Sequence, residues 1–131
     1  MCIRDSSSSA KNYLVRNPKP VSFTSFSKSE TQHAIRTLVF QKDIDVAEMT
    51  RALLQFERDE AEGFFRSVTL ENDTVFEKAS QLSNRHALEI GVRYLDTLHV
   101  ASALLVNATR FLTFDARQGK LAKAAGLEVK P

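Results

Sequence analysis

Three acidic residues lie where a parallel α/β fold places side chains for chemistry, at the starts of helices. We expect Glu30 in the first turn of a helix after a short strand, Asp96 near the start of a very apolar helix, and Asp115 between a strand and the last helix. The strand-to-helix junctions of a parallel sheet gather at one edge, where ligands bind. We therefore expect the three carboxylates to approach one another at that edge.

Carboxylates placed in this way repel one another unless a cation neutralises them, and hard oxygen ligands favour Mg²⁺ or Mn²⁺. An acid such as Asp96 in so apolar a helix is costly unless it is paired, hydrogen-bonded or bound to a metal. A bound cation of this kind lowers the pKa of a water and stabilises the charge that builds on a phosphodiester. The three acids together favour a metal site.

Taken singly, each acid is better explained as part of a helix cap. Glu30 completes a capping box with Ser27, and both Asp96 and Asp115 suit helix starts. Two neighbouring threonines are candidates to hold the acids or a metal-bound water, with packing or capping as the alternative: Thr97 and Thr113.

Three basic residues on the last helix are candidates to contact RNA phosphates, although a solvated helix face is the favoured interpretation: Arg117, Lys120 and Lys123. The net charge of +2 is compatible with a nucleic-acid partner and does not demonstrate one. The chain shows no Gly-rich phosphate loop, no Cys and His at zinc-ligand spacing, and no nucleophile elbow, which argues against those chemistries.

Strands alternate with helices along the chain, which predicts a three-layer α/β/α sandwich with a parallel sheet. The helix over 95–108 is apolar on nearly every face and is expected to be buried. Gly91 and Gly126 are expected to end the helices before them. We expect helices over 8–16, from 27, from 45, 73–89, 95–108 and 115–125, and strands over 21–24, 65–70, 110–114 and 127–129.

The chain of 131 residues suits a single domain, and its apolar stretches are too short to cross a bilayer. The single cysteine, Cys2, allows no internal disulfide, which fits a cytoplasmic protein. Residues 1–6, MCIRDS, translate back into a transposon end sequence that is widely used as a sequencing adapter. We therefore expect these six residues to be an artefact, with natural sequence missing before Ser7 and the domain over 7–131 incomplete.

Two segments resemble the PIN domain family. Residues 93–103, RYLDTLHVASA, are similar to its "hLDxLHhAsA" segment, and residues 111–115 and 121–127, FLTFD and LAKAAGL, to its closing "hhTfD…LAxxaGL" segment. Residues 25–38, with Glu30, resemble a third and weaker segment. The order and spacing of all three match.

The resemblance implies a Mg²⁺- or Mn²⁺-dependent endoribonuclease of the VapC toxin type, in which Glu30, Asp96 and Asp115 are metal-binding and catalytic. Relatives carry one more aspartate after a first, central strand, and that opening is absent here. We therefore expect a sheet that lacks its first central strand, and impaired activity. The resemblance also implies an antitoxin partner and a homodimer. The alternative is a non-catalytic PIN-like module that binds RNA or protein; a receiver-like phosphotransfer module fits less well, because Lys120 is poorly placed for it.

Overall fold

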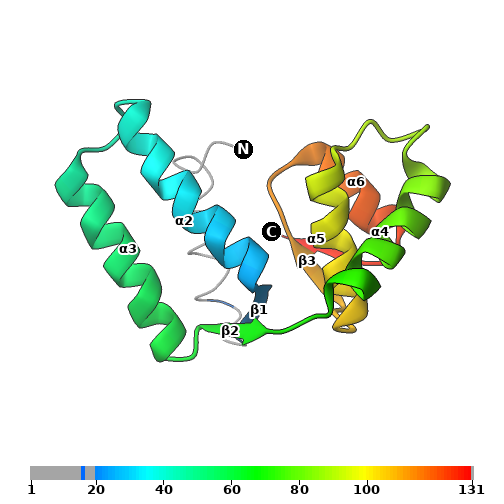
Figure 1. Ribbon diagram of the computed structural model, residues 1–131, viewed down its shortest axis with the longest axis horizontal. Helices are drawn as coiled ribbons and strands as arrows, with labels where there is room; N and C mark the ends of the chain where they lie inside the picture. The colour runs from blue at the N-terminus through cyan, green and yellow to red at the C-terminus, as the bar shows by residue number, and fades with distance from the viewer. Residues whose placement is uncertain (1–15, 17–19, 131) are drawn as a thin grey trace. The chain divides into compact units, whose positions relative to one another are not determined.

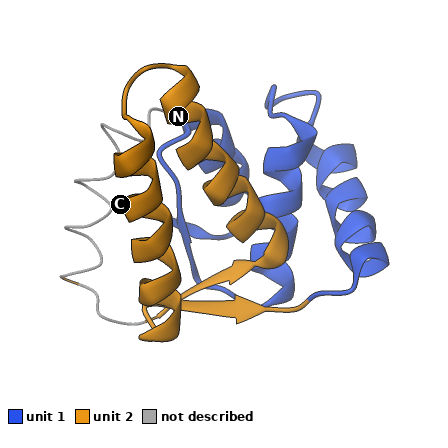
Figure 2. Ribbon diagram, turned by 60° about the vertical axis from the view of Figure 1, so that its left-hand side comes forward, with its two compact units in different colours: residues 1–13, 70–131 blue, residues 14–69 orange. Residues whose placement is uncertain are grey.

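The computed structural model describes Arg16 and residues 20–130. The helix expected over 8–16 therefore lies outside the described residues, apart from Arg16. The chain forms two compact units, one within residues 14–69 and the other built mainly from residues 70–131 (Figure 2). Each unit is described by itself.

The unit within residues 14–69 pairs two parallel strands with two helices that lie side by side (Figure 1). Strand β1 pairs with β2 so that Val21 lies opposite Phe65. The rings of Phe23, Phe56 and Phe65 pack at centroid distances of 5.4–6.0 Å. No described residue of this unit is fully buried, so this aromatic cluster is its main apolar contact. The elements are β1 (Val21–Thr24), α2 (Ser25–Phe40), α3 (Val46–Ala61) and β2 (Phe65–Val68).

Side-chain caps set where the helices of this unit begin. The Thr24 side chain accepts a hydrogen bond from the Ser27 amide at 3.1 Å, so α2 begins at Ser25. The capping box expected for Ser27 and Glu30 is therefore wrong. A capping box does open α3, where Asp45 accepts from the Glu48 amide at 2.7 Å and its own amide donates to the Glu48 side chain.

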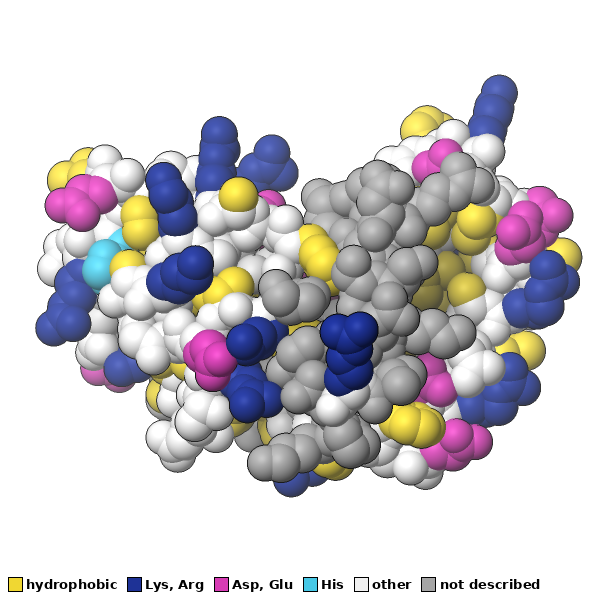
Figure 3. Space-filling view, turned by 180° about the vertical axis from the view of Figure 1, so that it is seen from behind, with side chains coloured by type: hydrophobic (Ala, Val, Ile, Leu, Met, Phe, Trp, Pro, Cys, Tyr) yellow, Lys and Arg dark blue, Asp and Glu magenta, His cyan; other side chains and the backbone are white. Residues whose placement is uncertain are grey.

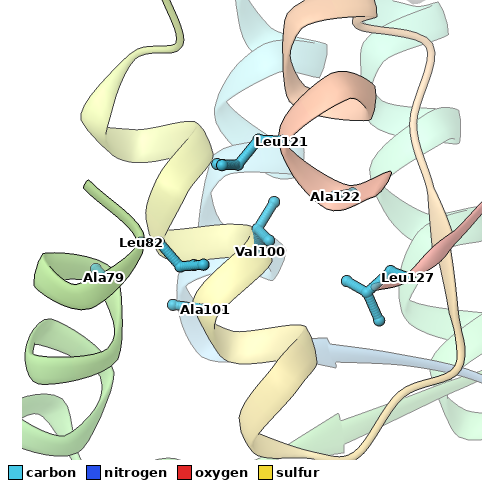
Figure 4. Close-up of a cluster of buried hydrophobic side chains, with 7 residues drawn as sticks. All are labelled: Ala79, Leu82, Val100, Ala101, Leu121, Ala122 and Leu127. Atoms are coloured by element: carbon cyan, nitrogen blue, oxygen red, sulfur yellow. The ribbon is translucent and has the colours of Figure 1, made fainter. Parts of the chain in front are cut away.

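The second unit contains the fully buried core of the described residues. Leu82 of α4, Val100 of α5 and Leu121 of α6 point toward one another, and Leu127 lies just before β4 (Figure 4). Ala79, Ala101 and Ala122 let the helices approach closely, since each is completely buried. The elements are α4 (Asn72–His86), α5 (Tyr94–Leu105), β3 (Arg110–Leu112), α6 (Ala116–Ala124) and β4 (Glu128–Lys130).

The two strands of this unit are parallel and place Arg110 opposite Glu128. Arg110 Nε lies 3.6 Å from Glu128 Oε2, and Lys130 Nζ lies 3.0 Å from Glu128 Oε1. The Lys130 hydrogen bond and charge, followed by the Arg110 charge, lower the pKa of the exposed Glu128 carboxyl. The Thr113 amide then donates to the Lys130 carbonyl at 2.9 Å, which carries the pairing one residue past β3.

The end of α6 is a Schellman motif. The Gly126 amide donates to the Lys123 carbonyl and the Leu127 amide to the Ala122 carbonyl, while Gly126 takes a φ of 96°. Buried Leu127 and Ala122 supply the apolar partners of the motif. The expectation that Gly126 closes this helix is confirmed.

The α/β class and the parallel strand pairing predicted from the sequence are confirmed. In the described residues the strands form two separate two-stranded sheets, β1–β2 and β3–β4, rather than one continuous sheet. None of the described helices is long and apolar enough to span a membrane.

Several expected helix limits are wrong. Helix α4 ends at His86. The Ala87 amide donates to the Ser83 carbonyl and the Ile90 amide to the His86 carbonyl, so a turn follows the helix and Gly91 does not end it. Helix α5 ends at Leu105, because Asn107 adopts a left-handed conformation with φ of 56°. Its start is also not buried on every face, since Leu95 is 52% exposed.

Two glycines of the second unit should respond in opposite ways to alanine. Gly119 lies inside α6, and an added Cβ would make ordinary contacts of 3.5 Å with Val129 and 3.6 Å with Thr113. We expect Gly119→Ala to raise the free energy of unfolding by about 0.5–1 kcal/mol. Gly126→Ala should lower it by about 1–2 kcal/mol, because the left-handed conformation disfavours a Cβ. Urea unfolding followed by circular dichroism measures both; equal shifts would contradict this account.

Candidate active site

Asp115 lies at the junction between β3 and α6. Its backbone is extended, and its Oδ1 accepts a hydrogen bond from the Gln118 amide at 2.9 Å, which makes it the N-cap of α6. The side chain is half-buried. The cap fixes the carboxylate at the positive end of the helix.

Asp96 is the third residue of α5 and is also half-buried. Its Oδ1 accepts a hydrogen bond from the Gln118 side-chain amide at 3.3 Å. A single residue, Gln118, thus contacts both carboxylates: its backbone donates to Asp115 and its side chain donates to Asp96. The structure brings these two sequence-predicted acids together.

Thr113 completes the cluster. Its hydroxyl accepts a hydrogen bond from the Asp115 amide at 3.1 Å and donates its own hydrogen to Gln118 Oε1 at 2.6 Å. Thr113 thus holds the Asp115 backbone, and its support of a metal site stays a prediction. We call Asp96, Thr113, Asp115 and Gln118 the two-aspartate cluster.

Gln118 is the member of the cluster that the sequence reasoning missed. A signal was present, because Gln118 stands three residues after an N-cap aspartate, the spacing of a capping box. In the structure its side chain turns to Asp96 and Thr113, so it links the start of α6 to the start of α5.

The other supporting candidates lie differently. Thr97 is 4% exposed. Its hydroxyl donates a hydrogen bond to the Arg93 carbonyl four residues earlier, so this bond is local to the start of α5. Arg117, Lys120 and Lys123 are exposed on α6, and Arg117 reaches the Gly91 carbonyl at 3.4 Å. Lys and Arg side chains project from the face of the molecule shown in Figure 3. Exposure fits a solvated helix face, and the contact of Arg117, Lys120 and Lys123 with RNA stays a prediction.

Glu30 belongs to the other unit and is exposed on α2. Because α2 begins at Ser25, Glu30 is its sixth residue and lies in the second turn rather than the first. A capping function is therefore excluded for Glu30. Its joining of Asp96 and Asp115 at one metal site stays a prediction.

The two-aspartate cluster suits a hard divalent cation by its donor set. Two carboxylates and a hydroxyl offer only oxygen, as Mg²⁺ and Mn²⁺ prefer. A carboxylate has about four lone-pair sites, so hydrogen bonding and metal binding can share its oxygens. Within residues 20–130 no group of three or more His, Cys, Asp or Glu side chains is placed to hold a metal. A metal site that included Asp96 and Asp115 would therefore need further ligands.

Comparison with known protein families finds that the PIN domain matches residues 17–124, most of the chain. The chain belongs to the PIN domain family. Members of this family are generally nucleases that bind nucleic acid and typically use divalent metals, and many are toxins. No curated protein and no solved structure shows significant similarity to the chain.

The two roles of Asp115, as helix cap and as charge, can be separated by substitution. Asp115→Ala should lower the free energy of unfolding by about 1 kcal/mol, because the Gln118 amide loses its acceptor. Asp115→Asn should have little effect, since asparagine caps helices as well as aspartate does. Chemical denaturation of the three proteins checks this; an asparagine variant as unstable as the alanine variant would show that the charge holds the fold.

Proposed function

We propose that the protein is a metal-dependent endoribonuclease of the VapC toxin type, the toxin of a type II toxin–antitoxin pair. The observation that carries the proposal is the pairing of Asp96 and Asp115 through Gln118 in a chain that belongs to the PIN domain family. Two half-buried carboxylates held close together are unfavourable unless a cation offsets their repulsion.

The residues of the cluster have distinct parts in such a reaction. Asp96 and Asp115 would hold Mg²⁺ or Mn²⁺ through their carboxylate oxygens, with Glu30 as the third predicted ligand. The bound cation would supply a water of lowered pKa and neutralise charge on the phosphodiester. Thr113 keeps the Asp115 backbone in place through the 3.1 Å hydrogen bond, so that the carboxylate starts from a fixed position. Thr97, buried beside Asp96 in the chain, is the second supporting candidate.

The proposal includes an incomplete metal site. In relatives a further aspartate follows a first, central strand, and we propose that this strand is missing and that residues 1–6 derive from an adapter. An unpaired strand edge leaves backbone groups without partners, so the chain should be less stable and less active than a form that carries the strand.

The proposed partners follow from the same class. The substrate is RNA, and Arg117, Lys120 and Lys123 are the candidate phosphate contacts near Asp115. An antitoxin and a second copy of the chain are proposed as protein partners in the cytoplasm.

Removing the negative charge of any one proposed metal ligand should strongly reduce RNA cleavage. We expect Asp96→Asn, Asp115→Asn and Glu30→Gln each to lower Mn²⁺-dependent cleavage of single-stranded RNA by about 100-fold or more, as loss of a charge-stabilising group does. The matched control is Glu77→Gln, an exposed acid on α4, which should cleave like the parent. Gel assays with and without EDTA measure the rates.

Two outcomes would contradict this proposal. Cleavage that survives EDTA would remove the metal from the reaction. RNA binding without cleavage, unchanged in the three variants, would favour the non-catalytic binding module.

Restoring the upstream strand tests the proposed truncation. Sequencing the source DNA before the codon for Ser7 supplies the natural residues. We expect the extended chain to melt at a higher temperature and to cleave RNA faster with Mn²⁺, since a central strand fills a gap whose cost is about several kcal/mol. Equal melting temperature and equal activity in the two proteins would show that nothing is missing.

A further inference from the structure

Gln118 bonds to both carboxylates of the two-aspartate cluster. Its backbone amide lies 2.9 Å from Asp115 Oδ1 and its Nε2 lies 3.3 Å from Asp96 Oδ1. The bond to Asp96 spans 22 positions of the chain and joins α6 to α5. The bond to Asp115 is local and belongs to the cap.

The direction of the Gln118 amide is fixed by its two neighbours. An ionised carboxylate only accepts hydrogen bonds, so the NH₂ group must face Asp96. Oε1 then faces Thr113, whose hydroxyl is free to donate because it accepts from the Asp115 amide. The amide is thus clamped at both ends, and a rotation of 180° would place two acceptors against each other at Asp96.

We propose that Gln118 is a positioning residue that sets the spacing and orientation of Asp96 and Asp115 for a divalent cation. This inference rests on the proposed function, because it concerns the same metal site. Groups that hydrogen-bond to metal ligands orient them, and their loss weakens metal binding by about 10–100-fold. Gln118 is uncharged, so it orients the two carboxylates without neutralising them. Their negative charge stays available to attract the cation.

The test uses the full 131-residue chain and Mn²⁺ alone, with affinity measured by isothermal titration calorimetry. Gln118→Met keeps the length of the side chain and removes both polar atoms, so we expect the Mn²⁺ affinity to fall by at least about 10-fold. The matched control is Gln81→Met on α4, an exposed glutamine of the same unit, which should leave the affinity unchanged.

Gln118→Glu distinguishes positioning from a general need for a stable fold. It keeps an acceptor for the Thr113 hydroxyl and puts a carboxylate beside Asp96. Repulsion should lower the melting temperature without Mn²⁺, whereas the added carboxylate should bind the cation. We therefore expect Mn²⁺ to raise the melting temperature of this variant more than that of the parent. A residue with only a structural role would lower both melting temperature and affinity.

The possible results separate the two proposals. If the parent binds Mn²⁺ and Gln118→Met binds it equally well, the positioning role is wrong and the proposed function is untouched. If Mn²⁺ stabilises Gln118→Glu no more than the parent, the positioning role is also wrong. If the parent binds no Mn²⁺ at all, the metal site fails, and the inference about Gln118 fails with it.

Discussion

The hydrogen bonds of Gln118 to both Asp96 and Asp115 are the interaction on which the candidate site of the second unit depends. Two like charges in a half-buried place need donors or a cation. The structure supplies donors through Gln118, from the amide at the start of α6 and from its side chain. The start of α6 is the positive end of that helix, which adds to the stabilisation. The proposed metal ion would bind the same two carboxylates.

The core keeps these groups in register. Val100 of α5 and Leu121 of α6 are fully buried, so the two helices that carry Asp96 and Gln118 share one packed interface. Strand β3 pairs with β4, and the Thr113 amide extends this pairing by donating to the Lys130 carbonyl. The pairing fixes the backbone just before Asp115, the N-cap of α6. The chemistry at one end of α6 and the Schellman motif at the other thus depend on one short helix.

Local signals in the sequence predicted the parts of this arrangement that arise from neighbouring residues. The strand over 21–24, Asp115 at a helix start and Gly126 at a helix end each follow from propensity and capping. Contacts over long separations were not predictable, and Gln118 with Asp96 is the main example. The end of α5 at Leu105, shortly before the left-handed Asn107, and the start of α2 at Ser25, after the N-cap Thr24, depend on local caps that compete with apolar periodicity. Glu30 was expected in a first turn because Ser27 offered a plausible cap that Thr24 takes instead.

The central claim is that Asp96 and Asp115 form part of a divalent cation site. Paramagnetic line broadening tests it most directly, because Mn²⁺ weakens the NMR signals of amides near the place where it binds. Substoichiometric Mn²⁺ added to the ¹⁵N-labelled chain should broaden the amide signals of Asp96, Asp115 and Gln118 first. The same signals should persist in Asp96→Asn at the same Mn²⁺ concentration. Broadening confined to other acidic residues, or no selective broadening, would contradict the account.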